Sequence, residues 1–398
     1  MIHKLRYLIL AGTALALLTG GSFLAKADTI ISGQLYVADY GKSELDRYTY
    51  TFDSTLGIIT GFTPDGIGGN TTNAYFLGGS GLPIKEGLQG TADDLIVVVG
   101  AHGSTQTTLE RFTLSGTYIG TIPVDFSAIN NGNVGIGNVA ITPDGKYEYA
   151  PLQTANEIIK IDLSNGNIVD TYGFTGAHDL TIAPNGDVYA ANYSTAGATV
   201  IRLDSNLNFK QNLVTTQAPG VSGNFRPSGL SIAADGSLYV QDNTQGSNDS
   251  VLHYTFTNSG GTLTANFDSA GSYIGSNSNN ALQFTFGNNI GPDGNLYIAA
   301  LGGGGNGSFG VPSGYVDGIY EFNTSNETVS QAIAGFTEKT GPVGASGLDA
   351  PKYLQFSSNF VPANDAGYDP APEPGTTALL LSGFACLAAL KRSRRRKS

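Results

Sequence analysis

Short segments of alternating apolar and polar residues follow tight turns at four places in the middle of the chain. Each turn is built on Asp-Gly or Asn-Gly and leads into a strand-like segment such as 188–192 or 238–242. Gly accepts the positive φ that tight hairpin turns need, and alternation with a period of two is typical of strands. The pattern therefore predicts β-hairpins rather than helices. The four turns are Pro143-Asp144-Gly145, Pro184-Asn185-Gly186, Ala234-Asp235-Gly236 and Pro292-Asp293-Gly294.

Each hairpin belongs to a larger unit of four predicted strands. One strand precedes the turn, as in 180–183, and two more follow the second strand, as in 157–162 and 167–170. Four-stranded antiparallel units that recur every ~40–60 residues are typical of β-propeller blades, which stack in a ring to cover both faces of each sheet. The second strands begin at six positions, which predicts six blades: Leu35, Leu95, Tyr147, Val188, Leu238 and Leu296.

The two ends of this repeat region complete each other. Residues 34–39 form a second strand without a first, and residues 350–356 form a first strand without a second. Pairing them closes the ring and leaves no exposed strand edge, whereas an open β-solenoid needs capped ends. We therefore predict an all-β, six-bladed β-propeller over residues 28–362. Residues 57–90 and 257–282 follow the pattern poorly and are either loops or strongly diverged strands.

Both termini carry targeting patterns outside the predicted ring. Residues 1–27 contain two early cations, an apolar stretch and Ala25-Lys26-Ala27, a combination typical of a cleavable secretory signal peptide. Residues 363–371 are predicted to be a linker. Residues 372–398 begin with a Pro-Glu-Pro motif, continue with an apolar run that predicts a short transmembrane helix, and end in six cations. Such a basic end favours the cytoplasmic side of a membrane.

The tail resembles the PEP-CTERM sorting signal of Gram-negative bacteria, and the residues that carry the resemblance are Pro372, Glu373 and Pro374 with the apolar and basic segments behind them. The resemblance implies an exported protein that is held for a time in the inner membrane. A signal peptidase and an exosortase would then process it for the cell surface or the extracellular space. It also implies an association with exopolysaccharide and the biofilm matrix.

The repeat of first strand, Asp-Gly turn and Leu-Tyr-Val-Ala-like strand is clearest in 137–210 and 226–256. It resembles the six-bladed propellers of the NHL-repeat and gluconolactonase/regucalcin-like (SMP-30) kind. The resemblance spans roughly residues 30–361 and implies the fold more strongly than a function, because this fold supports enzymes, binding proteins and scaffolds alike.

Charge and cysteine content exclude several kinds of chemistry. Removal of three cations with the signal peptide and six with the tail leaves 11 Lys and Arg against 32 Asp and Glu. Such an acidic surface repels nucleic acid, so we expect no nucleic-acid partner. The only cysteine, Cys386, lies in the tail. A disulfide, a thiolate nucleophile or a thiolate metal site is therefore excluded from the predicted propeller.

The residues that open the predicted first strands are expected to face a common rim of the central channel: Glu86, Asn138, His178 with Asp179, Ser228, Asn288 and Lys352. Oxygen-bearing side chains near this channel suggest a cation site, because Ca²⁺ prefers six to eight oxygen ligands. In the gluconolactonase-like enzymes a comparable Glu/Asn/Asn/Asp set holds the divalent metal, and the resemblance implies that Glu86, Asn138, Asn192 and Asp242 match it by position. The candidate ligands are Asp39, Glu86, Asn138, Asn192 and Asp242. The alternative is that these Asp and Asn residues cap turns at strand ends. Apolar residues at the matching positions of other blades interrupt the set.

His178 and Asp179 are the candidates for catalysis, because an acid beside a channel-facing imidazole can orient the ring. No other part of the sequence suggests a catalytic set. The leading hypothesis is therefore a non-enzymatic binding or scaffold protein of the cell surface or matrix. The alternative is a metal-dependent lactonase or hydrolase with its site at the channel mouth.

Overall fold

The computed structural model describes residues 30–41, 44–65, 74–76, 84–91, 93–100, 107–194, 197–244, 249–275, 282, 285–300, 317–334, 348 and 351–359. All of them belong to the predicted propeller. The predicted signal peptide, linker and sorting tail lie outside these residues. Within the described ranges, no helix has both the length and the apolar character needed to cross a membrane.

The described strands form six antiparallel sheets of at least four strands, one per blade. Blade 1 consists of β25 (Pro351–Phe356), β1 (Ile30–Asp39), β2 (Glu44–Asp53) and β3 (Ile58–Pro64), and β4 (Ala74–Phe76) pairs with β2. Blade 2 consists of β5 (Ile84–Gly90), β6 (Asp94–Val99), β7 (Thr108–Thr113) and β8 (Tyr118–Ile122). Blade 3 consists of β9 (Ala140–Ile141), β10 (Tyr147–Leu152), β11 (Glu157–Asp162) and β12 (Ile168–Gly173). Blade 4 consists of β13 (Ala177–Ile182), β14 (Val188–Asn192), β15 (Thr199–Leu203) and β16 (Phe209–Val214). Blade 5 consists of β17 (Pro227–Ile232), β18 (Leu238–Asp242), β19 (Ser250–Ser259) and β20 (Thr262–Tyr273). Blade 6 consists of β21 (Thr285–Ile290), β22 (Leu296–Ala300), β23 (Gly318–Asn323) and β24 (Thr328–Ala334). Two short 3₁₀ turns, η2 (Asn130–Gly132) and η3 (Ser357–Asn359), complete the described elements.

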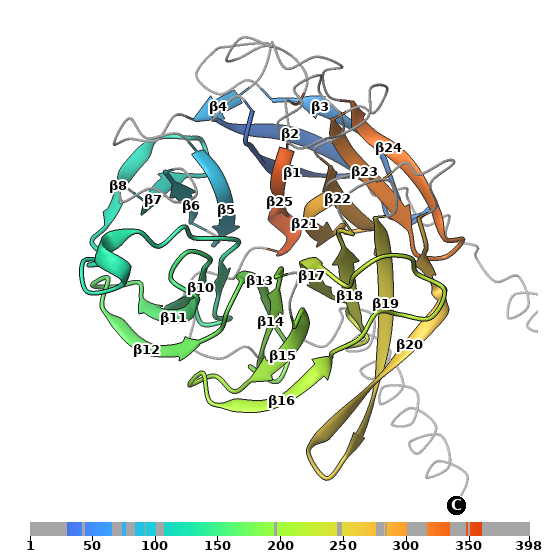
Figure 1. Cartoon of the computed structure of the whole chain (residues 1–398). Helices are drawn as coiled ribbons and strands as arrows, with labels where there is room; N and C mark the ends of the chain where they lie inside the picture. The colour runs from blue at the N-terminus through green and yellow to red at the C-terminus, as the bar shows by residue number, and fades with distance from the viewer. Residues whose placement is uncertain are drawn as a thin grey trace, which may run out of the picture.

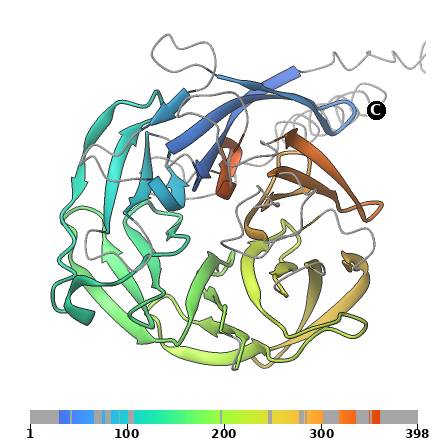
Figure 2. The same ribbon diagram turned by 45° about the horizontal axis from the view of Figure 1, so that its top comes forward.

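The blades stand around a common centre, with the first strand of each blade innermost (Figures 1 and 2). The inner strands contact one another in the order β25, β5, β9, β13, β17, β21 and back to β25. β25 pairs with β1 in the register Leu35 with Phe356 and Val37 with Leu354. The predicted closure of the ring by the two chain ends is therefore confirmed, and the open solenoid is excluded.

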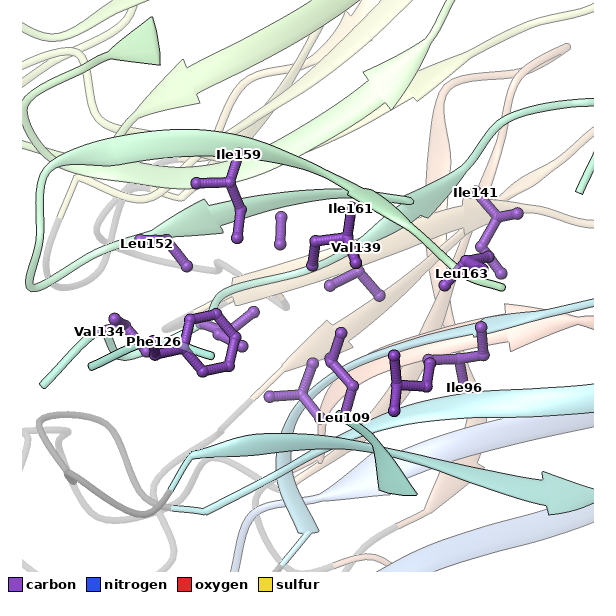
Figure 3. Close-up of a cluster of buried hydrophobic side chains, with 14 residues drawn as sticks. Ile96, Leu109, Phe126, Val134, Val139, Ile141, Leu152, Ile159, Ile161 and Leu163 are labelled. Atoms are coloured by element: carbon purple, nitrogen blue, oxygen red, sulfur yellow. The ribbon is translucent and has the colours of Figure 1, made fainter. Parts of the chain in front are cut away.

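The core is divided among the spaces between neighbouring blades. Along β1, Leu35 and Val37 pack toward blade 6, whereas Tyr36 and Ala38 pack toward blade 2. Successive strand residues point to opposite faces, so a strand covered on both faces reads as continuously apolar. Figure 3 shows one such space, where Ile96 of blade 2 and other side chains of that blade meet apolar side chains of blade 3. This double burial explains why the second strands give the strongest sequence signal.

The segments that fit the repeat poorly contain strands. Residues 58–64 form β3 and residues 262–273 form β20. Both are outer strands with mostly exposed or half-buried side chains. These stretches are therefore strongly diverged strands and not loops.

Close packing at the centre of the ring demands small residues on the inner strands. A Cβ atom added to Gly229 would clash with the carbonyl oxygen of Phe286 on the next inner strand. At Gly137 it would lie against the carbonyl oxygen of His178. Neither contact is compatible with a side chain, because both obstacles are backbone atoms. These glycines set how closely neighbouring blades approach at the axis.

Candidate functional site: the central channel

A β-bulge interrupts the inner strand of every blade at nearly the same height. In β13, for example, Ala177 opposes Asn192 and Asp179 opposes Ala191, so that His178 is the extra residue of the bulge. Bulges redirect side chains and are frequent at the rims of barrels and next to active sites. The residues at the bulges are Lys352, Lys85 to Gly87, Gly137 to Val139, His178, Ser228, and Phe286 with Gly287.

Several of these residues gather in one cluster, which we call the channel mouth: His178, Phe286 and Lys352 from the bulges, with Tyr193 and Arg226 beside them. The His178 ring lies 4.8 Å from the Tyr193 ring and 5.5 Å from the Phe286 ring. Lys352 Nζ lies 5.4 Å from the centre of the Phe286 ring. The Arg226 guanidinium lies 4.1 Å over the Tyr193 ring. All these contacts fall within the range of aromatic and cation–π interactions.

The position predicted for the mouth in blade 6 is corrected by the register. Asn288 was expected at this rim, but it opposes Ile298, whereas Phe286 and Gly287 stand together opposite Ala299. Phe286 therefore occupies the rim, and Asn288 lies deeper on the inner strand. A bulge shifts the alternation by one residue, and the sequence pattern gives no sign of where that happens.

The two catalytic candidates, His178 and Asp179, are held by different partners. The Nδ1 atom of His178 lies 3.0 Å from the carbonyl oxygen of Ser228 in the next blade. A carbonyl oxygen only accepts, so Nδ1 carries the proton in this contact. The ring is thus oriented by a backbone group of blade 5, where the sequence suggested Asp179. A catalytic role for the pair stays a prediction.

Asp179 connects three consecutive blades at the axis. One carboxylate oxygen accepts from the backbone N–H of Leu180 at 2.7 Å, and the other accepts from that of Leu230 in blade 5 at 3.0 Å. The side chain of Asn138 in blade 3 donates a further hydrogen bond. Burial raises the pKa of Asp179 to about 7, and these three hydrogen bonds oppose the shift. The residue therefore has a structural role that the sequence did not reveal.

Three of the five predicted metal ligands bond other groups in the described structure. Asn192 accepts from the N–H of Ser194 at 2.6 Å, as a turn cap does. Asp242 accepts from the N–H of Arg226 at 2.7 Å and from Gln217 at 2.8 Å. Asn138 bonds Asp179, Asp39 is fully buried, and the side chain of Glu86 lies outside the described atoms. Within the described ranges no cluster of three His, Cys, Asp or Glu side chains suits a metal. The metal site stays a prediction.

Arg226 is the main residue at the mouth that sequence reasoning missed. Its side chain is 7% exposed, and its Nε and Nη1 atoms are buried without a hydrogen-bond partner among the described residues. Asp242 lies near enough to interact with its charge, but that carboxylate bonds the backbone N–H of Arg226. Burial raises the pKa of Asp242 to about 6, although these groups pull it back. A cation next to Pro227 in a charge-poor stretch was the one available signal.

The other end of the inner strands opens into a cavity of about 820 Å³, which we call the polar chamber. In the second half of each inner strand, one residue contributes its side chain to the wall of the polar chamber. Five of these six are amides or hydroxyls, and in the neighbouring strands they oppose Ile96 or one of four tyrosines, Tyr189, Tyr239, Tyr297 and Tyr36. They are Gln89, Thr181, Ser231, Asn289 and Gln355, with Ile141 in blade 3. Leu180, Leu230 and other apolar side chains fill the spaces between them.

Two polar atoms of the chamber residues lack a partner in the part of the chain that the structure describes. The Nδ2 atom of Asn288 is buried with no hydrogen bond, whereas its Oδ1 accepts from Ser231 at 2.6 Å. The Nε2 atom of His253 is likewise buried without a partner, while its Nδ1 lies 3.1 Å from Asp268. His253 also stacks on Tyr239, with ring centres 4.6 Å apart. Unpaired buried polar atoms are costly and call for an explanation. A ligand in the chamber would supply one.

Comparison with known proteins finds likeness among solved structures only. No protein-family model and no curated protein sequence matches it. Among solved structures, it is similar to the periplasmic gluconolactonase of Pseudomonas aeruginosa, with 14% identity, 82% of this chain and 99% of that chain covered, and a TM-score of 0.48. It is also similar to a Lactobacillus plantarum protein, with 12% identity, 82% of this chain and 99% of that chain covered, and a TM-score of 0.48. Virginiamycin B lyase from Staphylococcus aureus is similar with 11% identity, 76% of this chain and 88% of that chain covered, and a TM-score of 0.41. Likeness at this level assigns no activity.

Proposed function

We propose that this protein binds a saccharide in the polar chamber and does so outside the cytoplasm. The observation that carries the proposal is the chamber wall, where amide and hydroxyl side chains from five blades alternate with apolar ones. Small-molecule sites are typically concave spaces of roughly 300–1,000 Å³ with a few well-placed polar groups. Amides and hydroxyls both donate and accept, so they match the hydroxyl groups of a neutral sugar.

The targeting segments support a site of action at the cell surface or in the matrix. The signal-like residues 1–27 and the PEP-CTERM-like residues 372–398 both lie outside the described structure. Signal peptidase and an exosortase are the proposed processing partners, and an exopolysaccharide is the proposed source of the sugar. Replacing Glu373 with Ala should leave an unprocessed form in the membrane fraction. Normal processing of the Glu373→Ala chain would contradict the sorting proposal.

The chamber is tested with two substitutions that alter its wall. Thr181→Val removes a hydroxyl while keeping the shape of the side chain, and Asn288→Leu removes the amide with the unpaired nitrogen. We expect each to weaken binding of neutral oligosaccharides roughly tenfold, since one net hydrogen bond is worth ~0.5–1.5 kcal/mol and an unpaired group costs more. Calorimetric titration of the purified domain with cello-, malto- and galacto-oligosaccharides gives the affinities.

Two results would reject the binding proposal. One is the absence of binding to every oligosaccharide by the unaltered protein. The other is unchanged affinity in both variants, which would place the sugar elsewhere. Thr60→Val is the matched control, because Thr60 is an exposed residue of β3 whose hydroxyl bonds Thr51 of the same blade.

A lactonase is the second candidate, and Asp242 is the residue that favours it. A general base works best with a pKa near the working pH, and burial brings the pKa of Asp242 to about 6. The residue lies beside the Arg226 backbone at the channel mouth. Lactone hydrolysis by the purified protein, lost in Asp242→Asn, would support this candidate. Absence of turnover with and without added Ca²⁺ would reject it.

A further inference from the structure

The channel mouth concentrates positive charge in a protein that is otherwise acidic. The whole chain has 20 Lys and Arg against 32 Asp and Glu. Yet Arg226 and Lys352 are both 7% exposed, and both lie in this one cluster together with the 4% exposed His178. Charged side chains are rarely buried unless a partner compensates them. For Arg226, two buried guanidinium donors lack such a partner among the described residues.

Arg226 gives the sharpest sign of what is missing. Its guanidinium is covered on one face by the Tyr193 ring at 4.1 Å, and Nε and Nη1 have no acceptor among the described residues. An aromatic ring contacts the flat face of a guanidinium and leaves its N–H groups, which lie in the plane, without a partner. Leaving a buried charged donor unpaired costs more than leaving a neutral one. An oxyanion is the acceptor that best matches guanidinium geometry.

Neighbouring acids do not fill this place in the described structure. Asp242 directs its oxygens to the Arg226 N–H and to Gln217. Asp249 is fully buried and accepts from both the backbone N–H and the hydroxyl of Thr285 through one oxygen. Among the ion pairs of the described residues, none joins Arg226 to either acid. The guanidinium thus keeps two donors for a molecule from outside.

The aromatic rings define the rest of the site. Phe286 lies 5.5 Å from His178 and 5.9 Å from Tyr193 between ring centres, and Lys352 Nζ lies 5.4 Å from the Phe286 ring centre. This places apolar surface between two cations. A small ligand with an anionic group and a less polar body would satisfy both parts of such a surface.

We propose that the channel mouth is a second binding site, for the oxyanion of an acidic sugar. Arg226 makes the direct hydrogen bonds to a carboxylate or phosphate group, Lys352 adds charge, and Phe286 and Tyr193 contact the sugar ring. The mouth and the polar chamber lie at opposite ends of the inner strands. This site therefore goes beyond the neutral-sugar site of the proposed function, and either site can exist without the other.

Three sugars that differ only at carbon 6 test the proposal: D-glucose, D-glucuronate and D-glucose 6-phosphate. We expect the unaltered protein to bind at least one of the two anions at least tenfold more tightly than glucose. The preference should weaken as NaCl rises from 50 to 500 mM, because the contact is charged. Which anion binds more tightly tells a carboxylate site from a phosphate site. Binding no tighter than glucose for both anions would overturn the proposal.

Substitution of Arg226 locates the anion. Arg226→Met keeps much of the side-chain stem and should remove the preference, whereas Arg226→Lys should keep part of it. Arg111→Met, which removes an outer cation of blade 2, is the matched control and should leave the preference unchanged. Folding of each variant is verified by far-ultraviolet circular dichroism. An anion preference that survives in Arg226→Met would overturn the assignment of the anion site to the channel mouth. The polar chamber is tested separately, by the binding of neutral oligosaccharides to Thr181→Val.

Discussion

Glu148 offers a direct test of the energetics of this fold, because its carboxyl group is buried between two blades without a hydrogen bond from the described residues. The side chain is 0% exposed, and neither carboxylate oxygen has such a partner. Its cross-strand neighbours are Ile141 and Ile161, both part of the apolar cluster in Figure 3. Burial raises the pKa of Glu148 from 4.5 to about 8, and the charge of Arg111 only partly opposes this.

The sign of the effect on stability is set by which state holds the proton. Between pH 4.5 and about 8, the folded protein keeps the proton on Glu148 while the unfolded chain releases it. The free energy of unfolding therefore falls as pH rises through this window, by ~1.4 kcal/mol per pH unit. Between pH 5 and pH 9 the loss due to Glu148 amounts to ~4 kcal/mol.

Glu148→Gln removes the titration and keeps the shape of the side chain. We expect the variant to match the unaltered protein to within ~1 kcal/mol at pH 5 and to exceed its free energy of unfolding by ~4 kcal/mol at pH 9. Urea unfolding followed by tyrosine fluorescence measures both, since the chain has 20 Tyr and no Trp. Other titrating groups cancel when the two proteins are compared at each pH.

The control is Glu157→Gln in the same blade, a change at a partly exposed position. A stability difference between Glu148→Gln and the unaltered protein that stays constant from pH 5 to pH 9 would refute the reasoning. It would mean that Glu148 is hydrated or paired in solution, and that its burial does not hold the proton.

Three further predictions concern the axis, the closure and the metal. Gly229→Ala should destabilise the folded protein by several kcal/mol in urea unfolding, because the new Cβ meets a backbone oxygen. The control Gly120→Ala, with open space around the new Cβ, should change the stability by less than ~1 kcal/mol. Equal effects of the two substitutions would contradict the close packing of the inner strands. Phe356→Ala should cost ~3–5 kcal/mol in the same assay, since this fully buried ring contacts blade 6 at 4.9 Å through Tyr297, and a smaller loss would show that the closing strand contributes little. If the predicted metal set is real, Ca²⁺ should raise the thermal midpoint of chelator-treated protein and Asp242→Asn should abolish the rise; no rise in the unaltered protein contradicts the metal prediction.

Local signals explain how much of the fold was predictable. The hairpin turns and the apolar second strands are set by short-range rules, so the blade number and the pairing of 34–39 with 350–356 could be predicted from the sequence. Outer strands such as β3 have mostly exposed side chains. With little burial to constrain them, their residues lose the alternating pattern, and the sequence left them open between loop and strand.

The candidate site was less predictable because it depends on bulges and on contacts between blades. His178 was found at the mouth, as its position in the repeat suggested. Phe286 replaced Asn288 there because a bulge shifts the register. Asp179 was expected to orient His178, yet it holds backbone N–H groups of two blades. Arg226 gave no periodic signal at all, since it lies just before an inner strand rather than within it.

Turn chemistry and alternation act between residues close in the chain, so the repeating hairpins, the apolar strands and the complementary ends can be read from the sequence. Tertiary structure alone decided what meets at the axis, where six strands far apart in sequence converge. At this axis, burial and register together leave donors of Arg226 and Asn288 without a partner among the described residues. Neighbouring residues in the sequence carry no record of such an absence, since a missing partner is a property of the assembled ring.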